Sequence, residues 1–191
     1  MTKTSDMALA RYIQHTLIRP GLTADDITKH CLQAVEYGFD AAMVPAAWVT
    51  FARDILAGTR TKLASAIDFP LGGMTTAGKR VEAQTLAAAG AEELDIGVRT
   101  GHLRSGLYDD YREDIAAVVS SVDVPIKVML ELPLLSVPER ERAVELAVAA
   151  GAKWLKNASS GAVGVATAED ISFLREHAPP NVRIKASGGN S

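Results

Sequence analysis

Apolar and polar positions follow a repeating pattern along the chain. Alanine-rich stretches with helical spacing end at a glycine, and a short run of β-branched or apolar residues follows each of them. The pattern occurs three times, with the glycines at Gly38, Gly90 and Gly151. Glycine often ends a helix because, without a Cβ atom, it takes the left-handed conformation without a clash. The pattern therefore predicts repeated helix–strand units.

Signals for the start and end of a helix are clearest in the first repeat. Thr23 is predicted as the N-cap, with Asp25 and Asp26 in the first turn and Gly38 after the last turn. Cys31 falls on the apolar side of this helix. It is the only cysteine of the chain, which excludes an intrachain disulfide and a cysteine-based metal site.

Seven short runs along the chain are predicted as strands. Helical or loop-rich segments separate them, so we expect parallel pairing through right-handed crossovers. The predicted strands are Ile13–Ile18, Ala41–Val44, Leu63–Asp68, Glu93–Val98, Ile126–Glu131, Trp154–Ala158 and Arg183–Ser187.

Two architectures fit this order, an open doubly wound sheet and a closed (β/α)8 barrel. An open sheet that binds a nucleotide normally has a glycine-rich turn after its first strand, whereas RPGLT follows here. A barrel brings the C-terminal ends of its strands together at one mouth, and polar residues recur near those ends. These residues are His15, Asp68, Asp95, Lys127, Glu131, Lys156 and Lys185.

We therefore predict an α/β fold, a (β/α)8 TIM barrel. The eighth β/α unit is expected to be absent from the chain, because the sequence stops at GGNS directly after the seventh strand. Residues 1–191 are predicted to form a single (β/α)-barrel domain that is incomplete at its C-terminus.

Composition narrows the function mainly by exclusion. The 191 residues are 48% apolar, enough for a core, and the net charge is −3 with both signs mixed along the chain. The sequence has no basic stripe of the kind that indicates a nucleic-acid partner. No continuous segment has the roughly 20 apolar residues that a membrane helix needs. The N-terminus has no apolar stretch of signal-peptide length. We expect a cytoplasmic protein with a small-molecule substrate.

Two lysines inside predicted strands are candidates for the chemistry. Lys156 stands in AKWLKNAS and Lys185 in VRIKASGG. Burial lowers the pKa of a lysine, and a second ammonium nearby lowers it further. The resulting neutral amine can attack a carbonyl to form a Schiff base, while Asp95 in EELDIG could move protons beside it. A purely structural role for these lysines stays open, because structural ion pairs also perturb pKa values.

At these residues the chain resembles 2-deoxyribose-5-phosphate aldolase over nearly its whole length. The resemblance implies that Lys156 is the Schiff-base lysine, that Lys185 lowers its pKa and that Asp95 relays protons. It implies reversible cleavage of 2-deoxy-D-ribose 5-phosphate into acetaldehyde and D-glyceraldehyde 3-phosphate, without a metal or organic cofactor, by a homodimer. The matching stretches are HTLIRPGLTADDI, FPLGGMTT, AGAEELDIGV, GLYDDYREDIAAVV, PIKVMLEL, AGAKWLK and IKASGG.

The surroundings of these three residues depart from the family pattern. Gln14 stands where members usually have an aspartate before the His-Thr pair, which is His15 and Thr16 here. His15 could contact substrate, but we favour a structural hydrogen bond across the barrel floor. After Lys156 members usually read Thr-Ser-Thr-Gly, whereas Asn157 begins a different sequence here.

The phosphate site implied by the resemblance consists of backbone N–H groups in glycine-rich turns. Gly161, Gly188 and Gly189 are available for it, whereas Ser160 replaces a glycine, and its Cβ could obstruct a ligand. Arg99 could be a new anion contact, but an exposed loop arginine is the interpretation we favour.

Two further polar residues are predicted to be structural. Lys127 and Glu131 are expected to share one face of a strand and to neutralise each other, with Lys127 as the third lysine to test. The four histidines lack close spacing, so we predict no metal site.

Two alternatives remain open. The altered residues after Lys156 would also suit a class I aldolase of the same fold with a different or non-phosphorylated aldehyde or sugar. The missing eighth unit would also suit a non-catalytic paralogue that binds a sugar phosphate.

Overall fold

A computed structural model describes residues 9–189. Residues 1–8 and 190–191 lie outside the described part; the second pair is the last two residues of the GGNS end. The chain divides into two compact units. The first comprises Met1–Ala66 and Thr85–Leu94, and the second comprises Ile67–Gln84 and Asp95–Ser191. A single domain over residues 1–191 stays a prediction.

All seven predicted strands are confirmed, and their order in the sheet follows the chain. Parallel pairing is also confirmed, with β1 beside β2 and β2 beside β3 in the first unit, and with β5 beside β6 and β6 beside β7 in the second. The strands are β1 (Gln14–Thr16), β2 (Ala41–Met43), β3 (Lys62–Ile67), β4 (Glu93–Gly97), β5 (Ile126–Met129), β6 (Trp154–Lys156) and β7 (Arg183–Lys185).

Every strand ends one or two residues earlier than predicted, and in two cases a predicted strand residue has positive φ, which is not an extended conformation. Asp68, with φ 54°, follows β3, and Glu131, with φ 55°, follows β5 after one further residue. These are the two non-glycine residues with positive φ in the described part of the chain. A side chain in this conformation is strained, and such strain gathers at functional sites.

Helix α2 (Ala24–Tyr37) confirms the predicted caps of the first repeat. Thr23 and Asp26 form a capping box, in which each side chain accepts the backbone N–H of the other residue. Gly38 ends the helix in the left-handed conformation at φ 66°. Cys31 is fully buried on the inner face, as expected. The short η1 (Ala46–Trp48) and α3 (Val49–Leu56) complete the first pair of helices.

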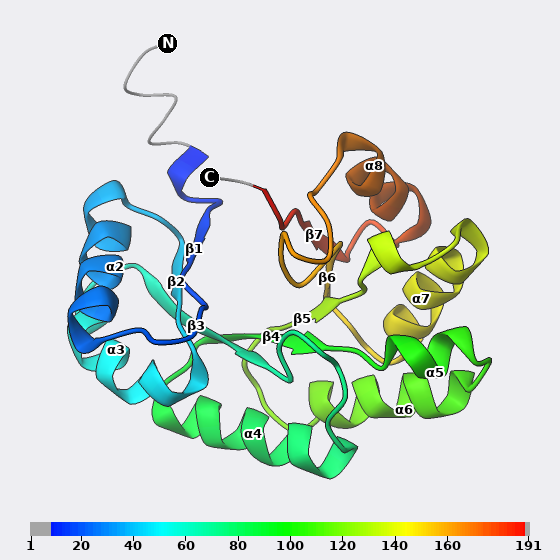
Figure 1. The fold of residues 1–191 in the computed structure, drawn as a ribbon, viewed down its shortest axis with the longest axis horizontal. Coiled ribbons are helices and arrows are strands. Elements are labelled where there is room, and N and C mark those ends of the chain that lie inside the picture. The colour runs from blue at the N-terminus through cyan, green and yellow to red at the C-terminus, as the bar shows by residue number, and fades with distance from the viewer. Residues whose placement is uncertain (1–8, 190–191) are drawn as a thin grey trace. The chain divides into compact units, whose positions relative to one another are not determined.

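The helices of the second unit connect its parallel strands. Helix α6 packs against α7, α7 against α8, and α8 against β7, while Figure 1 shows α7 and α8 on one side of β6 and β7. The helices after β3 are α4 (Thr76–Ala89), α5 (Thr100–Arg104), α6 (Tyr108–Val119), the short η2 (Leu132–Leu134), α7 (Val137–Ala149) and α8 (Ala168–His177).

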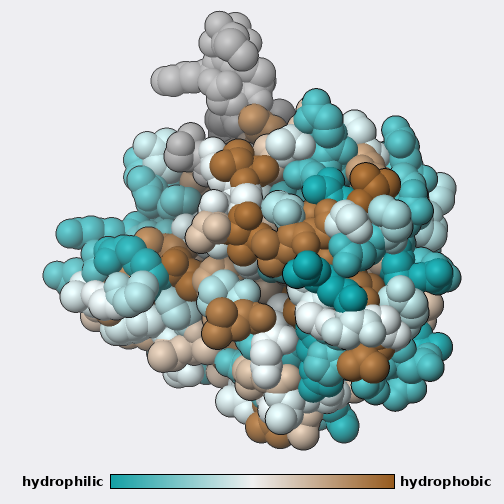
Figure 2. All heavy atoms as spheres, turned by 45° about the vertical axis from the view of Figure 1, so that its right-hand side comes forward, coloured by the Kyte–Doolittle hydropathy of each residue, from teal (hydrophilic) through white to brown (hydrophobic). Residues whose placement is uncertain are grey.

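Buried apolar side chains form the interior of each unit. In the first unit, Ala41, Met43 and Ala64 of neighbouring strands pack together with almost no exposure. Figure 2 shows hydrophilic residues over much of the drawn face, with smaller hydrophobic patches between them. Across residues 9–189, no helix combines the length and the apolar character needed to cross a membrane.

Candidate active site

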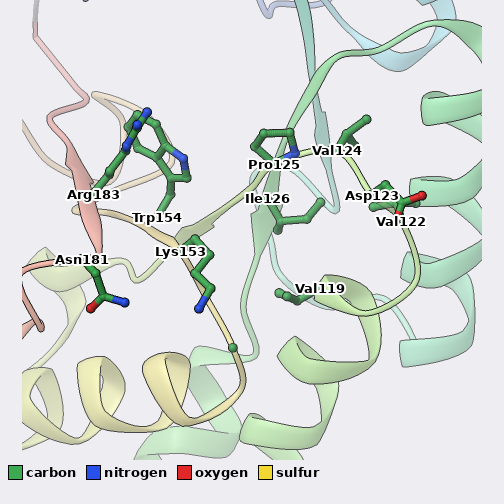
Figure 3. A pocket seen from close by; sticks show the side chains of 11 residues that line it. Val119, Val122, Asp123, Val124, Pro125, Ile126, Lys153, Trp154, Asn181 and Arg183 are labelled. Atoms are coloured by element: carbon green, nitrogen blue, oxygen red, sulfur yellow. The ribbon is translucent and has the colours of Figure 1, made fainter.

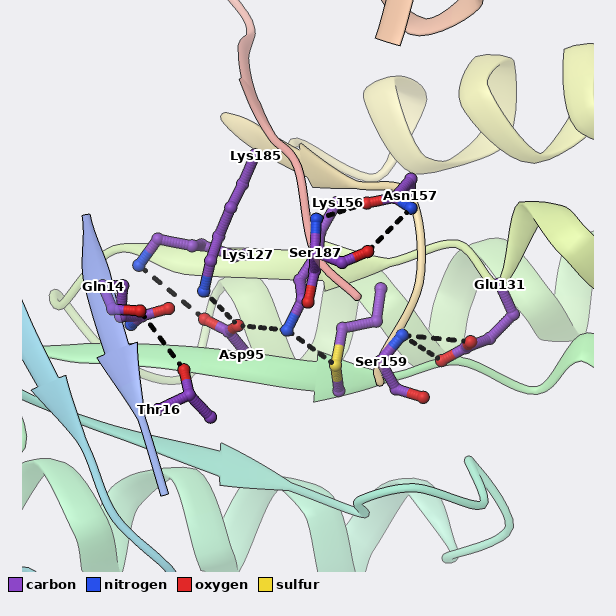
Figure 4. Close-up of polar contacts among 11 residues, drawn as sticks. Gln14, Thr16, Asp95, Lys127, Glu131, Lys156, Asn157, Ser159, Lys185 and Ser187 are labelled. Carbon is purple, nitrogen blue, oxygen red and sulfur yellow. Dashed lines mark hydrogen bonds and ion pairs between the residues drawn. The ribbon is translucent and has the colours of Figure 1, made fainter. Parts of the chain in front are cut away.

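Four neighbouring strands each place one charged side chain in a common cluster (Figure 4). Asp95 lies in the middle of β4, Lys127 is the second residue of β5, and Lys156 and Lys185 are the last residues of β6 and β7. Lys156 and Lys185 are direct partners in the parallel pairing of β6 and β7. The three residues that the sequence predicts as catalytic are therefore brought together, with Lys127 beside them.

The Asp95 carboxylate lies at the centre of this cluster. Its Oδ2 atom accepts from Nζ of Lys156 at 3.0 Å and from Nζ of Lys185 at 3.1 Å. Its Oδ1 atom is 3.7 Å from Nζ of Lys127. The side chains of Asp95, Lys127 and Lys156 are 0%, 3% and 3% exposed, so these charges interact with little solvent screening. One carboxylate thus faces three buried or nearly buried amines.

Burial and charge shift the pKa values of the cluster in a definite direction. Burial alone would raise the pKa of Asp95, but the ammonium groups of Lys185, Lys156 and Lys127 outweigh it and lower that pKa to about 2. Burial lowers the pKa of Lys185 to about 8, with Lys156 and Lys127 adding to the shift and Asp95 opposing it. Asp95 is therefore ionised near pH 7, and Lys185 gives up its proton more readily than an ordinary lysine.

Two buried side chains hold the loop that follows Lys156. The Asn157 amide donates to the Ser187 carbonyl oxygen at 3.0 Å and accepts the Ser187 N–H at 2.8 Å. Both carboxylate oxygens of Glu131 accept the backbone N–H of Ser159 at 3.1 Å. Burial raises the pKa of Glu131, although the hydrogen bonds from Ser159 and the charge of Lys156 oppose this. The chain on the C-terminal side of Lys156 is therefore fixed on both sides.

The glycines predicted to bind phosphate also lie together. Gly188 and Gly189 have φ of 99° and 72°, and a Cβ on Gly188 would lie 2.3 Å from the Gly164 carbonyl oxygen. The Cβ position of Gly161 is 3.5 Å from the Gly189 nitrogen. Among the described residues none accepts the N–H of Gly161, Gly188 or Gly189, so these donors are available to an anion. Ser160 accepts the Ala162 N–H at 3.3 Å and so closes a local turn.

The predicted His-Thr pair lies in the first unit, and His15 faces its helix layer. His15 Nε2 is 3.1 Å from Oε1 of Gln33, and its ring stacks on His30 with centroids 4.2 Å apart. A structural role for His15 stays a prediction, and its bond reaches helix α2 rather than the barrel floor. Thr16 is exposed and makes a weak 3.4 Å bond to the Gln14 carbonyl oxygen. Both polar atoms of the Gln14 amide are buried without a hydrogen-bond partner in residues 9–189.

Two predictions about other charged residues are wrong. Strand β5 ends at Met129, so Glu131 no longer follows the strand alternation that would place it beside Lys127, and it binds the Ser159 backbone instead. Arg99 is not an exposed loop arginine, because its side chain is only 18% exposed and lies 3.4 Å from Asp114.

A second buried charge cluster was missed in the sequence. Lys79 of α4 is fully buried, and its Nζ donates to the Gly97 carbonyl oxygen at 2.8 Å and to Asp114 at 2.7 Å. Asp68 lies 3.2 Å from the same Nζ, and its carboxylate accepts the N–H groups of residues 73 and 74. The cluster therefore fixes the end of β4, two residues beyond Asp95. Helical spacing from Lys79 to the buried Ala83 was the signal that could have revealed it.

A separate cavity of about 540 Å³ lies at the opposite ends of β5, β6 and β7 (Figure 3). Ile126, Trp154 and Arg183, the first residues of these strands, line it together with the exposed Lys153. It contains no member of the Asp95 cluster, whose reactive amines lie at the last residues of β6 and β7. The cavity is therefore not the candidate active site.

Comparison with known proteins identifies the family. No family model matches the chain. A deoxyribose-phosphate aldolase of Brevibacillus brevis is 40% identical over 184 residues, which cover 96% of this chain and 83% of that protein. The enzyme of Alkaliphilus oremlandii is 40% identical over 185 residues, covering 96% and 83%. This chain belongs to the deoxyribose-phosphate aldolase family.

Solved structures agree with that assignment. A putative deoxyribose-phosphate aldolase from Coccidioides immitis matches with a TM-score of 0.89 at 31% identity, covering 96% of this chain and 74% of that one. The deoxyribose phosphate aldolase of Aeropyrum pernix, described as a unique tetramer, matches with a TM-score of 0.87 at 31% identity, covering 97% and 80%. The predicted TIM-barrel class is confirmed, and within residues 9–189 its strands number seven. The expectation of an aldolase, and hence of an enzyme, is likewise confirmed.

Proposed function

We propose that this chain is a class I aldolase that reversibly cleaves 2-deoxy-D-ribose 5-phosphate into acetaldehyde and D-glyceraldehyde 3-phosphate. One observation carries the proposal: the Asp95 carboxylate contacts amines from three neighbouring strands, two of them at the ends of β6 and β7. Packing alone does not require three buried amines around one carboxylate, because an apolar core of the same volume is generally no less stable. The names of the relatives give the reaction for which such amines are suited.

Lys156 is the proposed nucleophile, and Asp95 and Lys185 are the proposed groups that accept and donate protons beside it. Nζ of Lys156, once it has given up a proton, adds to the C1 aldehyde of the open-chain sugar, and loss of water gives an iminium. The C2–C3 bond then breaks as its electron pair moves towards the iminium and the C3 hydroxyl loses its proton to a base, which releases D-glyceraldehyde 3-phosphate and leaves an enamine on Lys156. Protonation of the resulting enamine at C2 and hydrolysis of the iminium release acetaldehyde and the free lysine. Lys185, with a pKa of about 8, can exchange protons at the Asp95 oxygen that it shares with Lys156.

The N–H groups of Gly161, Gly188 and Gly189 are the proposed phosphate contacts. Backbone N–H groups that point to a common place can bind an anion without a charged side chain. An aldolase that uses a non-phosphorylated substrate is the alternative, since Ser160 stands in the same loop. The two are separated by comparing kcat/KM for deoxyribose 5-phosphate and for deoxyribose. Cytoplasmic location and a homodimer stay predictions, and light scattering of the purified protein tests the second.

Borohydride trapping tests the central proposal. The protein is incubated with acetaldehyde, reduced and digested, and the modified lysine is located by mass spectrometry. We expect the reduced adduct on Lys156, its loss in Lys156→Met, and its retention in Lys153→Met, which changes an exposed lysine of the same segment. An adduct on Lys185 or Lys127 would overturn the assignment of the nucleophile. A folded protein that forms no adduct would instead be a binding paralogue.

A further inference from the structure

We infer that Asn157 is a positioning residue that keeps the two amines of Lys156 and Lys185 at a fixed spacing around Asp95. Asn157 directly follows Lys156, and Ser187 comes two residues after Lys185. The expected effect on kcat rests on the proposed function, whereas the expected effect on the position of Lys185 can be measured in the free protein. No motif of the sequence assigned a role to this asparagine.

The Asn157 amide continues the pairing of β6 and β7 beyond the last residues of the strands. Lys156 and Lys185 are the final backbone partners, and the next link consists of a side chain that bonds both the N–H and the carbonyl oxygen of Ser187. On the other side, backbone bonds from Leu130 to Lys156 and from Leu132 to Asn157 hold the same segment to the chain after β5. The segment that carries Lys156 is therefore held from both neighbours (Figure 4).

Burial makes this link sensitive to substitution. Asn157 is 0% exposed, so water does not readily replace its two hydrogen bonds. Truncating the amide would leave the N–H and carbonyl oxygen of Ser187 without these partners, and the chain around Ser187 would move to recover them. Because Ser187 directly precedes Gly188 and Gly189, the same movement would disturb the turn proposed to hold phosphate.

The residue type suits this link. An amide offers a donor group and an acceptor side by side, which matches the carbonyl oxygen and the N–H of Ser187. A threonine, by contrast, has one hydroxyl on a shorter side chain. Asn157 therefore provides a two-bond connection that threonine supplies at most in part.

The charges that face Lys185 make its titration a direct reporter of its position. Asp95 on β4, Lys127 on β5 and Lys156 on β6 surround its amine. Burial and the charges of Lys156 and Lys127 lower its pKa to about 8, whereas Asp95 opposes this shift. If the end of β7 moves outwards, Lys185 gains solvent and its pKa rises towards that of an ordinary lysine. A residue that contributes only to stability would leave this pKa unchanged.

The experiment compares Asn157→Ala, Asn157→Thr and the wild type by NMR titration of 13C-labelled lysines in the free protein. The Lys185 signal is assigned by its loss in Lys185→Arg. We expect the pKa of Lys185 to rise clearly in Asn157→Ala and less in Asn157→Thr. For deoxyribose 5-phosphate, we expect kcat to fall about 10- to 100-fold in Asn157→Ala, as for a small misplacement of reacting groups, with partial recovery in Asn157→Thr.

Ser65→Ala is the matched control. Ser65 is also fully buried and also joins two neighbouring β/α units through a side-chain bond, here to the Val44 carbonyl oxygen at 2.9 Å. It should lose stability while the pKa of Lys185 and kcat stay as in the wild type. An unchanged Lys185 pKa in folded Asn157→Ala would overturn the inference, as would an unchanged pKa in Asn157→Thr if the alanine variant does not fold. A shifted pKa in a protein without aldolase activity would support the positioning role and refute the proposed function.

Discussion

At the scale of single residues, the Asp95 carboxylate concentrates most of the electrostatics of the site. It is completely buried and is contacted by Lys127, Lys156 and Lys185. Three ammonium groups would repel one another strongly without it, so its charge both stabilises the fold and holds the amines together. Its removal should therefore affect stability and chemistry in the same variant.

Asp95→Asn should lower the free energy of unfolding by about 3–5 kcal/mol, because buried cations lose their counter-charge. Activity should fall about 100-fold or more, the range typical for the loss of a proton-transfer group. Urea unfolding and steady-state kinetics measure the two effects. Asp54→Asn is the control, since Asp54 is largely exposed and pairs with exposed Arg53, so both quantities should stay near the wild-type values. Wild-type stability in Asp95→Asn would contradict the proposed balance of charges.

The three residues predicted from the sequence as catalytic were recognisable because lysines and a buried aspartate are rare inside strands. Asp95, Lys156 and Lys185 meet at one carboxylate oxygen, as their positions on neighbouring strands suggested. The roles of Asn157 and Glu131 were not recognisable. Both side chains bond the backbone of a segment that is distant in the sequence. Sequence spacing does not show which backbone N–H and carbonyl groups lack a partner within their own strand or helix.

At the scale of elements, alternation and helical spacing located every strand but not where each one ends. The predicted strands ran on through Asp68 and Glu131, whose positive φ values end the extended conformation. A Cβ atom makes that conformation costly, more so for glutamate than for aspartate, whose short polar side chain can form local hydrogen bonds. Side-chain hydrogen bonds stabilise it here, since Asp68 accepts two N–H groups of its own loop and Glu131 accepts that of the distant Ser159. Such bonds leave no periodic signal in the sequence.

The Lys79 cluster should be the main determinant of how β4 and the loop after β3 are held. Lys79→Met keeps the length of the side chain but leaves Asp114 and Asp68 without their buried cation. We expect a loss of about 3–5 kcal/mol in the free energy of unfolding, measured by chemical denaturation. The neighbouring Arg80→Met changes an exposed residue of the same helix and should have little effect. Equal losses in both variants would show that helix propensity, and not the cluster, is responsible.

At the scale of the whole molecule, the Asp95 cluster makes stability depend on pH. The folded pKa of Asp95 is lowered to about 2 from 3.8, so the folded state binds its proton more weakly than the unfolded state. Its contribution, about 2 kcal/mol, is fully present above about pH 4 and is lost as the pH falls towards 2. Urea unfolding between pH 6 and about pH 2 should show this decline in the wild type and a smaller one in Asp95→Asn. Parallel declines in both proteins would contradict it.

Lys185 acts in the opposite pH range. Its folded pKa of about 8 lies below the ordinary value of 10.5, so the folded state binds this proton more weakly than the unfolded state. The resulting loss of folding stability is fully present below about pH 8 and disappears as the pH rises to 10.5. This contribution alone therefore makes the protein more stable towards alkaline pH, until other groups titrate.

The division into two compact units gives the molecule a built-in pair of optical reporters. The chain has two tryptophans, and each unit contains one: Trp48 before α3 in the first and Trp154 at the start of β6 in the second. Trp154 lies within cation–π distance of Lys127 and Arg183, whereas Trp48 contacts the ring of Phe51. Fluorescence of Trp48→Phe and of Trp154→Phe would thus follow each unit separately during denaturation. Coincident curves would mean that the units unfold in one cooperative step, and separated curves would give each unit its own stability.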